Sequence, residues 1–328
     1  MLTCRDSMSR AFEFGHLPVL LNPALDLLNI REDGLYVDCT LGGGGHSSAI
    51  LTRLGFGGRL IAVDRDDDAL RAGGERLAAI GSLAVWQTVH GNFADLDLVF
   101  EELNIKGADG ILADLGVSSW QLDQSDRGFG YSQDGPLDMR MNQAGGQTAA
   151  DVVNSYQEKE LVRILREYGE ERFAGRIASA IVAYRNRQPF RTTVELAELV
   201  RSAMPAAGRN EAQHPARRTF QAIRIEVNQE LAAVEKLLSK APDLLNEGGR
   251  ICIITFHSLE DRLVKEAFRR FEHPCICPRD FPVCACGKKP LGRVVTRKAI
   301  IADSHEEKDN PRSRSAKLRC FEKGGGAS

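Results

Sequence analysis

The chain has 328 residues, of which 43% are hydrophobic, and its formal net charge is −2 at pH 7. This length and composition allow one large folded domain or two, and the small net charge means that any surface for nucleic acid must be local. No apolar run approaches the roughly 18 residues that cross a bilayer, and the start of the chain lacks the basic and apolar regions of a secretory signal. We therefore expect a cytoplasmic protein with no membrane partner.

Short apolar runs alternate with amphipathic segments over the first third of the chain. The apolar runs predict strands at 35–39, 59–63, 84–89 and 109–114. Apolar residues at helical spacing predict helices at 46–54, 66–79 and 93–103. Strands that alternate with helices form a parallel sheet covered on both faces, so we predict a doubly wound α/β fold.

The first predicted strand runs into four consecutive glycines, Gly42 to Gly45, and the second ends in Asp64. Glycines let the backbone turn tightly and approach a ligand, while the helix that follows presents free N–H groups. A carboxylate at the end of the second strand can accept hydrogen bonds from both hydroxyls of a ribose. Four glycines also occur in flexible linkers, but here strands flank the run. The pattern predicts a pocket for an adenosine-containing cofactor.

Details of the loop separate the possible cofactors. A dinucleotide site needs a third glycine where this chain has Ser47 or Ser48, and a triphosphate loop needs a lysine that is absent here. The pattern Asp38-x-Thr40-x-Gly42-x-Gly44 resembles the opening of class I S-adenosylmethionine methyltransferases, with Thr40 in place of their first glycine. A dehydrogenase remains a distant alternative.

Beyond Asp114 the alternation stops, and the next βα unit is predicted as a helix near 226–240 and a strand at 250–256. Between Asp114 and this unit, the sequence pattern predicts helices at 158–168, 171–185 and 193–203. We therefore expect a sheet domain in two parts, 10–122 and 223–328, around an inserted, mainly helical substrate-recognition domain at 123–222. Two β-like runs, 293–301 and 316–322, are expected to form the final hairpin of the sheet.

Ten short motifs follow one another along nearly the whole chain, at 16–21, 43–47, 64–66, 109–119, 127–129, 134–141, 168–171, 219–222, 256–261 and 310–312. They include His16-x-Pro18-Val19-Leu20-Leu21, Gly43-Gly44-Gly45-His46-Ser47 and Asn310-Pro311-Arg312. Together they resemble the bacterial 16S ribosomal RNA cytosine-N(4)-methyltransferase family, RsmH or MraW. The resemblance implies a Rossmann-like class I fold with an inserted all-helical domain.

The same resemblance implies an enzyme that transfers a methyl group from S-adenosylmethionine to the exocyclic N(4) amine of a cytidine. The cytidine would lie in the decoding region (P site) of 16S rRNA, and the partner would be the small ribosomal subunit. The matching cofactor positions are Gly42, Gly44, Gly45 and His46 in the loop, Asp64 at the ribose, Phe93 beside the adenine, and Asp114 and Gln121 near the methionine. Phe93 also begins an apolar helix face, so core packing is its alternative role.

A cytosine amine is a poor nucleophile, because its lone pair is delocalised, so the site must hold the nitrogen and accept its hydrogens. The acidic or amide residue followed by Pro-Pro-aromatic, which many amino methyltransferases use, is replaced here by Asp114-Leu115-Gly116-Val117. Asp138 is our candidate for orienting the amine, with turn stabilisation as its alternative role. His257 is a candidate contact to the RNA base or phosphate, or a structural histidine. Ser258 and Asp261 are expected to cap the helix that follows.

Two arginine- and lysine-rich segments, 201–224 and 287–298, are candidate phosphate contacts, although ordinary solvated surface is the simpler interpretation for any single residue. Two other functions stay open. One is an amine methyltransferase acting on another nucleic acid or on protein, and the other is a non-catalytic, RNA-binding ribosome-assembly factor. The sequence leaves the oligomeric state, monomer or homodimer, undecided.

Four of the eight cysteines, Cys275, Cys277, Cys284 and Cys286, lie within twelve residues of one another. Such a group can form a tetrahedral zinc site or a redox pair, or can stay an unmetallated loop. The Cys-x-Cys spacing is less typical of zinc than Cys-x-x-Cys, and we assign no metal to the predicted active site.

Overall fold

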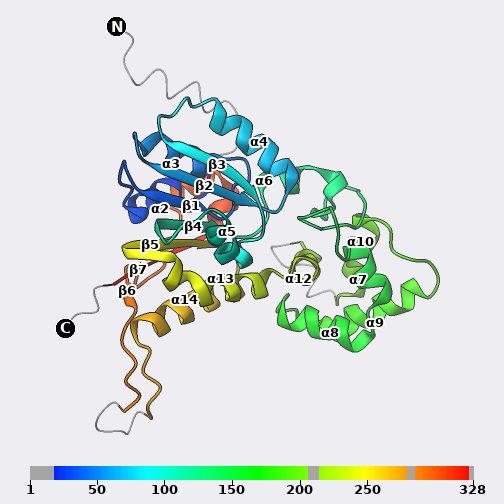
Figure 1. The fold of residues 1–328 in the computed structure, drawn as a ribbon. Helices are drawn as coiled ribbons and strands as arrows, with labels where there is room; N and C mark the ends of the chain where they lie inside the picture. Colours follow the sequence, from blue (N-terminus) through cyan, green and yellow to red (C-terminus); the bar gives the residue numbers. More distant parts are fainter. Residues whose placement is uncertain (1–17, 206–213, 279–284, 325–328) are drawn as a thin grey trace.

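The computed structural model describes residues 18–205, 214–278 and 285–324. Its centre is a seven-stranded sheet of order β3-β2-β1-β4-β5-β7-β6 (Figure 1). Strands β1 to β5 are parallel, whereas β7 is antiparallel to both β5 and β6. The strands are β1 (Leu35–Asp38), β2 (Arg59–Asp64), β3 (Val85–His90), β4 (Ala108–Asp114), β5 (Leu245–Thr255), β6 (Gly292–Val294) and β7 (Lys317–Lys323). The predicted doubly wound α/β fold is confirmed.

Helices cover both faces of the sheet, because successive strand residues alternate between two buried clusters. Tyr36 and Leu60 pack on one side, and Val37 and Ile61 pack on the other. The first side is covered by α2 (Leu21–Leu28), α3 (Gly45–Arg53) and α4 (Asp67–Ala78). The second is covered by η1 (Phe93–Asp95), α5 (Leu96–Glu102), α13 (Glu230–Leu244) and α14 (Ser258–Glu272).

A helical lobe beside the sheet has its own apolar core, formed by residues between Phe129 and Ile223 (Figure 1). It contains α7 (Ala149–Ser155), α8 (Glu158–Glu167), α9 (Ala174–Arg185), α10 (Thr193–Ala203) and α12 (Arg217–Asn228), and α6 (Ser119–Asp123) and η2 (Ser125–Arg127) lead into it. In α8 the buried residues are Leu161, Ile164 and Leu165, at helical spacing. The domain boundaries at 122/123 and 222/223 stay a prediction.

Three predicted elements differ from the structure. The helix expected at 226–240 is split into α12 and α13, because Gln229 has a left-handed backbone with φ +51°. The strand expected at 250–256 begins earlier, at Leu245. Of the run 293–301, only β6 and an isolated bridge at Ile300 pair with β7. The final antiparallel pair therefore exists, but α15 (Ser304–Asp309) and η3 (Pro311–Ser315) separate its strands.

Within the described residues, none of the helices has the length and apolar character needed to cross a membrane.

Candidate active site

The carboxyl ends of four strands meet at one edge of the sheet, because β2, β1, β4 and β5 are parallel neighbours. Three of them end in aspartates, Asp38, Asp64 and Asp114, and His257 follows β5. Open α/β sheets bind their ligands at this edge. The topology thus gathers predicted site residues that lie more than two hundred positions apart in the chain.

The loop between β1 and α3 turns at two glycines. The backbone φ is +49° at Gly42 and +74° at Gly44, a region that residues with a side chain rarely adopt. A Cβ at Gly44 would also lie 3.1 Å from the Cα of Gly73 in α4. Gly45 then begins α3. The loop therefore needs glycine at Gly42 and Gly44, and this requirement explains the sequence signal.

Asp64 ties this loop to the end of β2. Its Oδ2 accepts the backbone N–H of Gly42 at 2.8 Å, and its Oδ1 accepts that of Asp66 at 3.0 Å. Burial raises the pKa of Asp64, although these two N–H donors act in the opposite direction. Each carboxylate oxygen has a second lone pair, so the side chain can still accept a pair of hydroxyl donors.

Asp38 and Thr40 join the ends of β1 and β4. Asp38 is fully buried and accepts Ser47 Oγ–H at 2.6 Å and the Thr40 backbone N–H at 3.0 Å. Thr40 Oγ in turn accepts the backbone N–H of Asp114 at 2.7 Å. Thr40 thus uses its hydroxyl at the position where the related pattern has glycine. Burial raises the pKa of Asp38 to about 7.

His46, in the first turn of α3, lies close to Asp114, the last residue of β4. His46 is buried, and its Nε2 lies 3.1 Å from the carbonyl oxygen of Val19, which fixes a proton on Nε2. Its Nδ1 lies 3.6 Å from Asp114 Oδ2. Burial lowers the pKa of His46 to about 4 and raises the pKa of Asp114 well above its usual range, with the charges of Asp38 and Glu260 adding to the latter. Asp114 Oδ1 is buried and has no hydrogen-bond partner among the described residues.

Gln121 belongs to a buried network that sequence reasoning missed. Its Nε2 donates to Asp66 Oδ2 at 2.6 Å, and its Oε1 accepts the backbone N–H of Ser118 at 3.0 Å. Asp66 also pairs with Arg127 at 2.9 Å, and both side chains are buried. Asp66 and Arg127 lie within motifs noted above, but no local signal pairs residues so far apart. The network links the end of β2 to the entrance of the helical lobe.

Phe93 begins η1, immediately after β3, at the same edge of the sheet. Its ring is partly buried and packs against the core cluster beneath α5 and α13. Both roles considered for it, at the sheet edge and in the core, are compatible with this position.

Asp138 lies in a turn of the helical lobe. Its carboxylate binds Arg140 through two side-chain contacts of 2.8 Å and also accepts the Arg140 backbone N–H at 3.0 Å. Partial burial acts to raise the pKa of Asp138, but hydrogen bonds from Arg140 and its charge outweigh burial and hold the pKa below its usual value. Arg127 donates to the carbonyl oxygens of Arg140 and Met141, so this turn is tied to Asp66. The turn-stabilising role therefore exists, and a role toward substrate stays a prediction.

His257 caps α14, one residue earlier than expected. Its Nδ1 accepts the backbone N–H of Glu260 at 3.4 Å, and its Nε2 lies 3.1 Å from Glu260 Oε1. The predicted cap by Ser258 and Asp261 is wrong, because the extended backbone of His257 makes Ser258 the first helical residue. Asp261 pairs instead with Arg319 of β7 at 2.6 Å.

A buried acidic group extends this region. Glu230, at the start of α13, lies with His257 and Glu260 so that their ligand atoms are within 4.8 Å of one another. Arg224 binds both oxygens of Glu230 at 2.8 Å. Arg224 is therefore paired inside the protein, so ordinary solvated surface does not describe it, and a phosphate contact from it stays a prediction.

Arg201 and the second basic segment are more exposed than Arg224. Arg201 is 61% exposed and lies 3.9 Å from Glu198, and Arg209 is outside the described residues. The second basic segment remains at the surface, with Lys288, Lys289, Arg293, Arg297 and Lys298 all exposed. Of these, Arg293 pairs with Glu322 at 2.8 Å. A phosphate contact from these residues stays a prediction.

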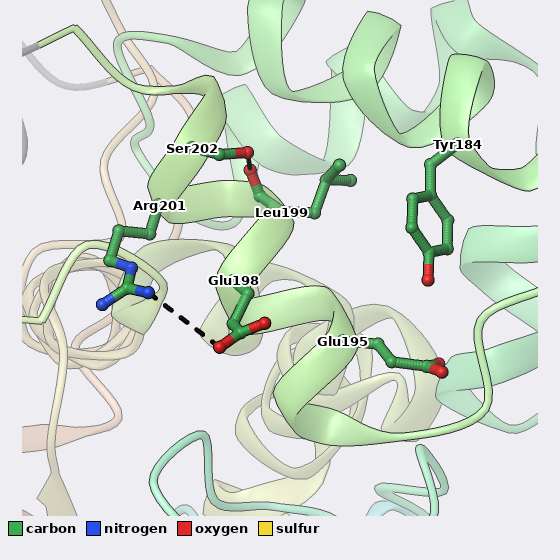
Figure 2. Close-up of a pocket in the computed structure, with 6 residues that line it drawn as sticks. All are labelled: Tyr184, Glu195, Glu198, Leu199, Arg201 and Ser202. Atoms are coloured by element: carbon green, nitrogen blue, oxygen red, sulfur yellow. Dashed lines mark hydrogen bonds and ion pairs between the residues drawn. The ribbon is translucent and has the colours of Figure 1, made fainter.

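A surface depression of about 720 Å³ lies in the helical lobe, between α9 and α10 (Figure 2). It is lined by Tyr184, Glu195, Glu198, Leu199, Arg201 and Ser202. Figure 2 shows Glu198 and Arg201 paired on one face of α10. None of the predicted cofactor-binding or catalytic residues lines it, so it is separate from the sheet-edge site.

Residues 13–324 match the model of a family described as the MraW methylase family. The chain is 54% identical over 311 residues to a ribosomal RNA small subunit methyltransferase H of Carboxydothermus hydrogenoformans, covering 95% of this chain and 98% of that protein. A protein of the same name from Clostridium botulinum is 52% identical, with coverage of 95% and 99%. A putative rRNA-methylase structure from Clostridium thermocellum aligns with 94% of this chain and 100% of that chain, at 13% identity and a TM-score of 0.43.

Proposed function

Since the chain belongs to the MraW methylase family, we propose that it methylates the exocyclic N(4) amine of a cytidine in the decoding region (P site) of 16S rRNA, with S-adenosylmethionine as methyl donor. The small ribosomal subunit is its proposed partner. The names of the relatives support an rRNA substrate. The observation that carries the cofactor assignment is the group of carboxylates Asp38, Asp64 and Asp114 at one sheet edge.

The charge of this group favours a cationic ligand. Asp38 and Asp114 both have raised pKa values, because burial and neighbouring carboxylates oppose their ionisation. A ligand with an ammonium and a sulfonium group relieves that repulsion, whereas the phosphates of a dinucleotide or a nucleoside triphosphate would increase it. This contrast argues against the dehydrogenase alternative.

The residues present fit S-adenosylmethionine. The unsatisfied, buried Asp114 Oδ1 is an acceptor suited to the ammonium of the methionine part, and the open lone pairs of Asp64 suit the ribose hydroxyls. We propose that Gly42, Gly44, Gly45 and His46 shape the loop around the cofactor. Phe93 would lie beside the adenine, and Gln121 would hold the methionine end. When bound, the cofactor supplies a methyl group on a sulfonium sulfur.

We assign activation of the cytosine amine to side chains of the protein that accept hydrogen bonds and protons. As the cytosine nitrogen forms its new bond it becomes positively charged and must lose a proton, and a carboxylate can orient its hydrogens and accept that proton. We propose Asp138 for this role, because Arg140 keeps it ionised. The resulting ammonium is a strong acid, so even a carboxylate of depressed pKa can take its proton.

Contact with the substrate is less well supported for His257 than for Asp138. The side chain is 8% exposed, and both of its ring nitrogens face Glu260. We propose that contact with the RNA requires the ring to leave Glu260. The helical lobe and the basic segment 287–298 are the proposed surfaces for the surrounding RNA, from which the target base must be extruded.

The test uses small ribosomal subunits from cells that lack this gene. We expect purified protein and S-adenosylmethionine to produce N(4)-methylcytidine at one position in the decoding region, detected by nucleoside mass spectrometry and mapping. Methylation of DNA or protein amines, with none in the subunits, would support the second function. Failure to bind S-adenosylmethionine would support a non-catalytic factor.

A variant pair tests the amine-orienting residue. Asp138→Asn should lower kcat about 10²-fold or more and leave cofactor affinity unchanged, because it removes a proton acceptor. Asp151→Asn is the matched control, since Asp151 is also a hydrogen-bonded carboxylate of the helical lobe, in the capping box of α7. Equal rates for Asp138→Asn and the wild type would contradict the proposed role.

A further inference from the structure

A long excursion, from residue 273 to residue 291, connects α14 to β6. It leaves the sheet domain after Glu272 and returns at Gly292, and Figure 1 shows its two described arms, 273–278 and 285–291, projecting from the body. Neither described arm contains a helix or a strand. Ile276 and Leu291, the large apolar residues of the arms, are 70% and 47% exposed. Burial of apolar side chains therefore does not fix the arms.

The base of the excursion is closed by ordinary contacts. The backbone N–H of Leu291 donates to the carbonyl oxygen of Phe271 at 2.8 Å, and that of Val294 donates to Glu272 Oε1 at 2.9 Å. Beyond the base, the arms approach each other where the cysteines lie. Cys275 and Cys277 are on the outgoing arm, and Cys286 is on the returning arm.

Three sulfur atoms converge at that point. The Sγ atoms of Cys275, Cys277 and Cys286 all lie within 4.8 Å of one another, and those of Cys275 and Cys286 are 3.9 Å apart. In a tetrahedral zinc site with Zn–S bonds of about 2.3 Å, sulfur ligands lie about 3.8 Å from each other. The backbone N–H of Ala285 points at Cys277 Sγ at 3.3 Å. Such donors around a sulfur are the outer contacts that support a metal-bound thiolate.

We propose that Cys275, Cys277 and Cys286 bind a zinc ion that joins the two arms of this excursion. A disulfide would use only two of the three sulfurs, whereas a metal ion accounts for all three. Thiolates select zinc over magnesium, calcium or manganese, and each thiol releases its proton on binding. Cys284 lies outside the described residues, and the inference rests on the other three. The proposal is independent of the methylation reaction, because none of the three cysteines belongs to the sheet-edge site.

The first experiment measures metal in the full-length chain, purified without chelators and with its thiols reduced. Elemental analysis should find about one zinc per chain, and X-ray absorption at the zinc edge should find at least three sulfur neighbours at about 2.3 Å. Reduced protein without zinc would overturn the proposal. Iron in place of zinc, or a disulfide between two of the three cysteines in protein isolated under non-reducing conditions, would also overturn it.

Variants identify the ligands. Cys275→Ser, Cys277→Ser and Cys286→Ser should each weaken zinc binding at least about 10–100-fold, since even changes to outer contacts have effects of that size. Cys4→Ser removes a cysteine distant in sequence and should keep its zinc. Far-UV circular dichroism and the urea midpoint confirm that each variant is folded. Full zinc content in the three variants, or equal loss in Cys4→Ser, would show that the ligands are other residues.

Limited proteolysis tests the structural consequence. If zinc holds the arms together, its removal by a strong chelator should increase trypsin cleavage at Lys288, which is exposed beside Cys286. Restoring zinc should slow the cleavage again in the wild type but not in Cys286→Ser. Cleavage at Lys288 that is indifferent to zinc in the wild type would overturn the role of the ion in joining the arms.

Discussion

Replacing Asp64 by alanine tests the proposed cofactor site most directly. In the structure its two oxygens accept the N–H groups of Gly42 and Asp66, and their remaining lone pairs are proposed to accept two ribose hydroxyls. Two charge-assisted hydrogen bonds, each contributing about 1.5–3 kcal/mol, give an expected loss of about 3–6 kcal/mol. S-adenosylmethionine should therefore bind about 10²–10⁴-fold more weakly.

The assay is isothermal titration calorimetry on folded protein, with a control at the opposite edge of the sheet. Asp109 accepts the backbone N–H of Leu35 at 2.9 Å and pairs with Arg31, so Asp109→Ala removes a similar set of bonds away from the site. Asp109→Ala should lower stability and leave the Kd unchanged. A folded Asp64→Ala protein whose Kd lies within a few-fold of the wild-type value would refute the assignment.

Two further predictions concern His46 and Thr40, next to the glycine loop. His46 has a pKa lowered to about 4 by burial, so it binds its proton more readily in the unfolded chain, and the contribution of this side chain to stability falls as the pH decreases from 6.5 to 4. His46→Gln should lack that loss, so its free energy of unfolding should rise by about 3 kcal/mol relative to that of the wild type over this pH range. Urea unfolding at several pH values measures this difference. A difference in unfolding free energy that stays constant with pH would contradict the burial of a neutral ring. Thr40→Val should lose about 1–3 kcal/mol of unfolding free energy, because it leaves the Asp114 N–H without its acceptor. Thr52→Val, which removes an exposed hydroxyl, should change little, and equal effects of the two substitutions would count against the role of Thr40.

The elements of the sheet domain are determined largely by local sequence. The first four strands and the helices between them lie within one or two residues of the ranges expected from hydrophobic spacing. Gly42 and Gly44 signal the loop because positive φ angles require their residue type, whatever surrounds them. In the helical lobe, α8 and α10 follow the same rule. Signals of this kind depend only on neighbours along the chain.

Contacts between distant segments were decided by the tertiary structure. Asp66, Gln121 and Arg127 form one buried network, yet each is an ordinary polar residue in its own segment. Arg224 appears in a basic segment but pairs with Glu230. The cap of α14 is His257, because the backbone is still extended at that residue. The spacing of the cysteines indicates a possible metal site, but only the placement of the two arms brings the sulfur atoms of Cys275, Cys277 and Cys286 within 4.8 Å of one another. Chain order specifies which residues are available, but hydrogen bonds and ion pairs form in space, so their partners follow from the packing of the whole sheet and lobe.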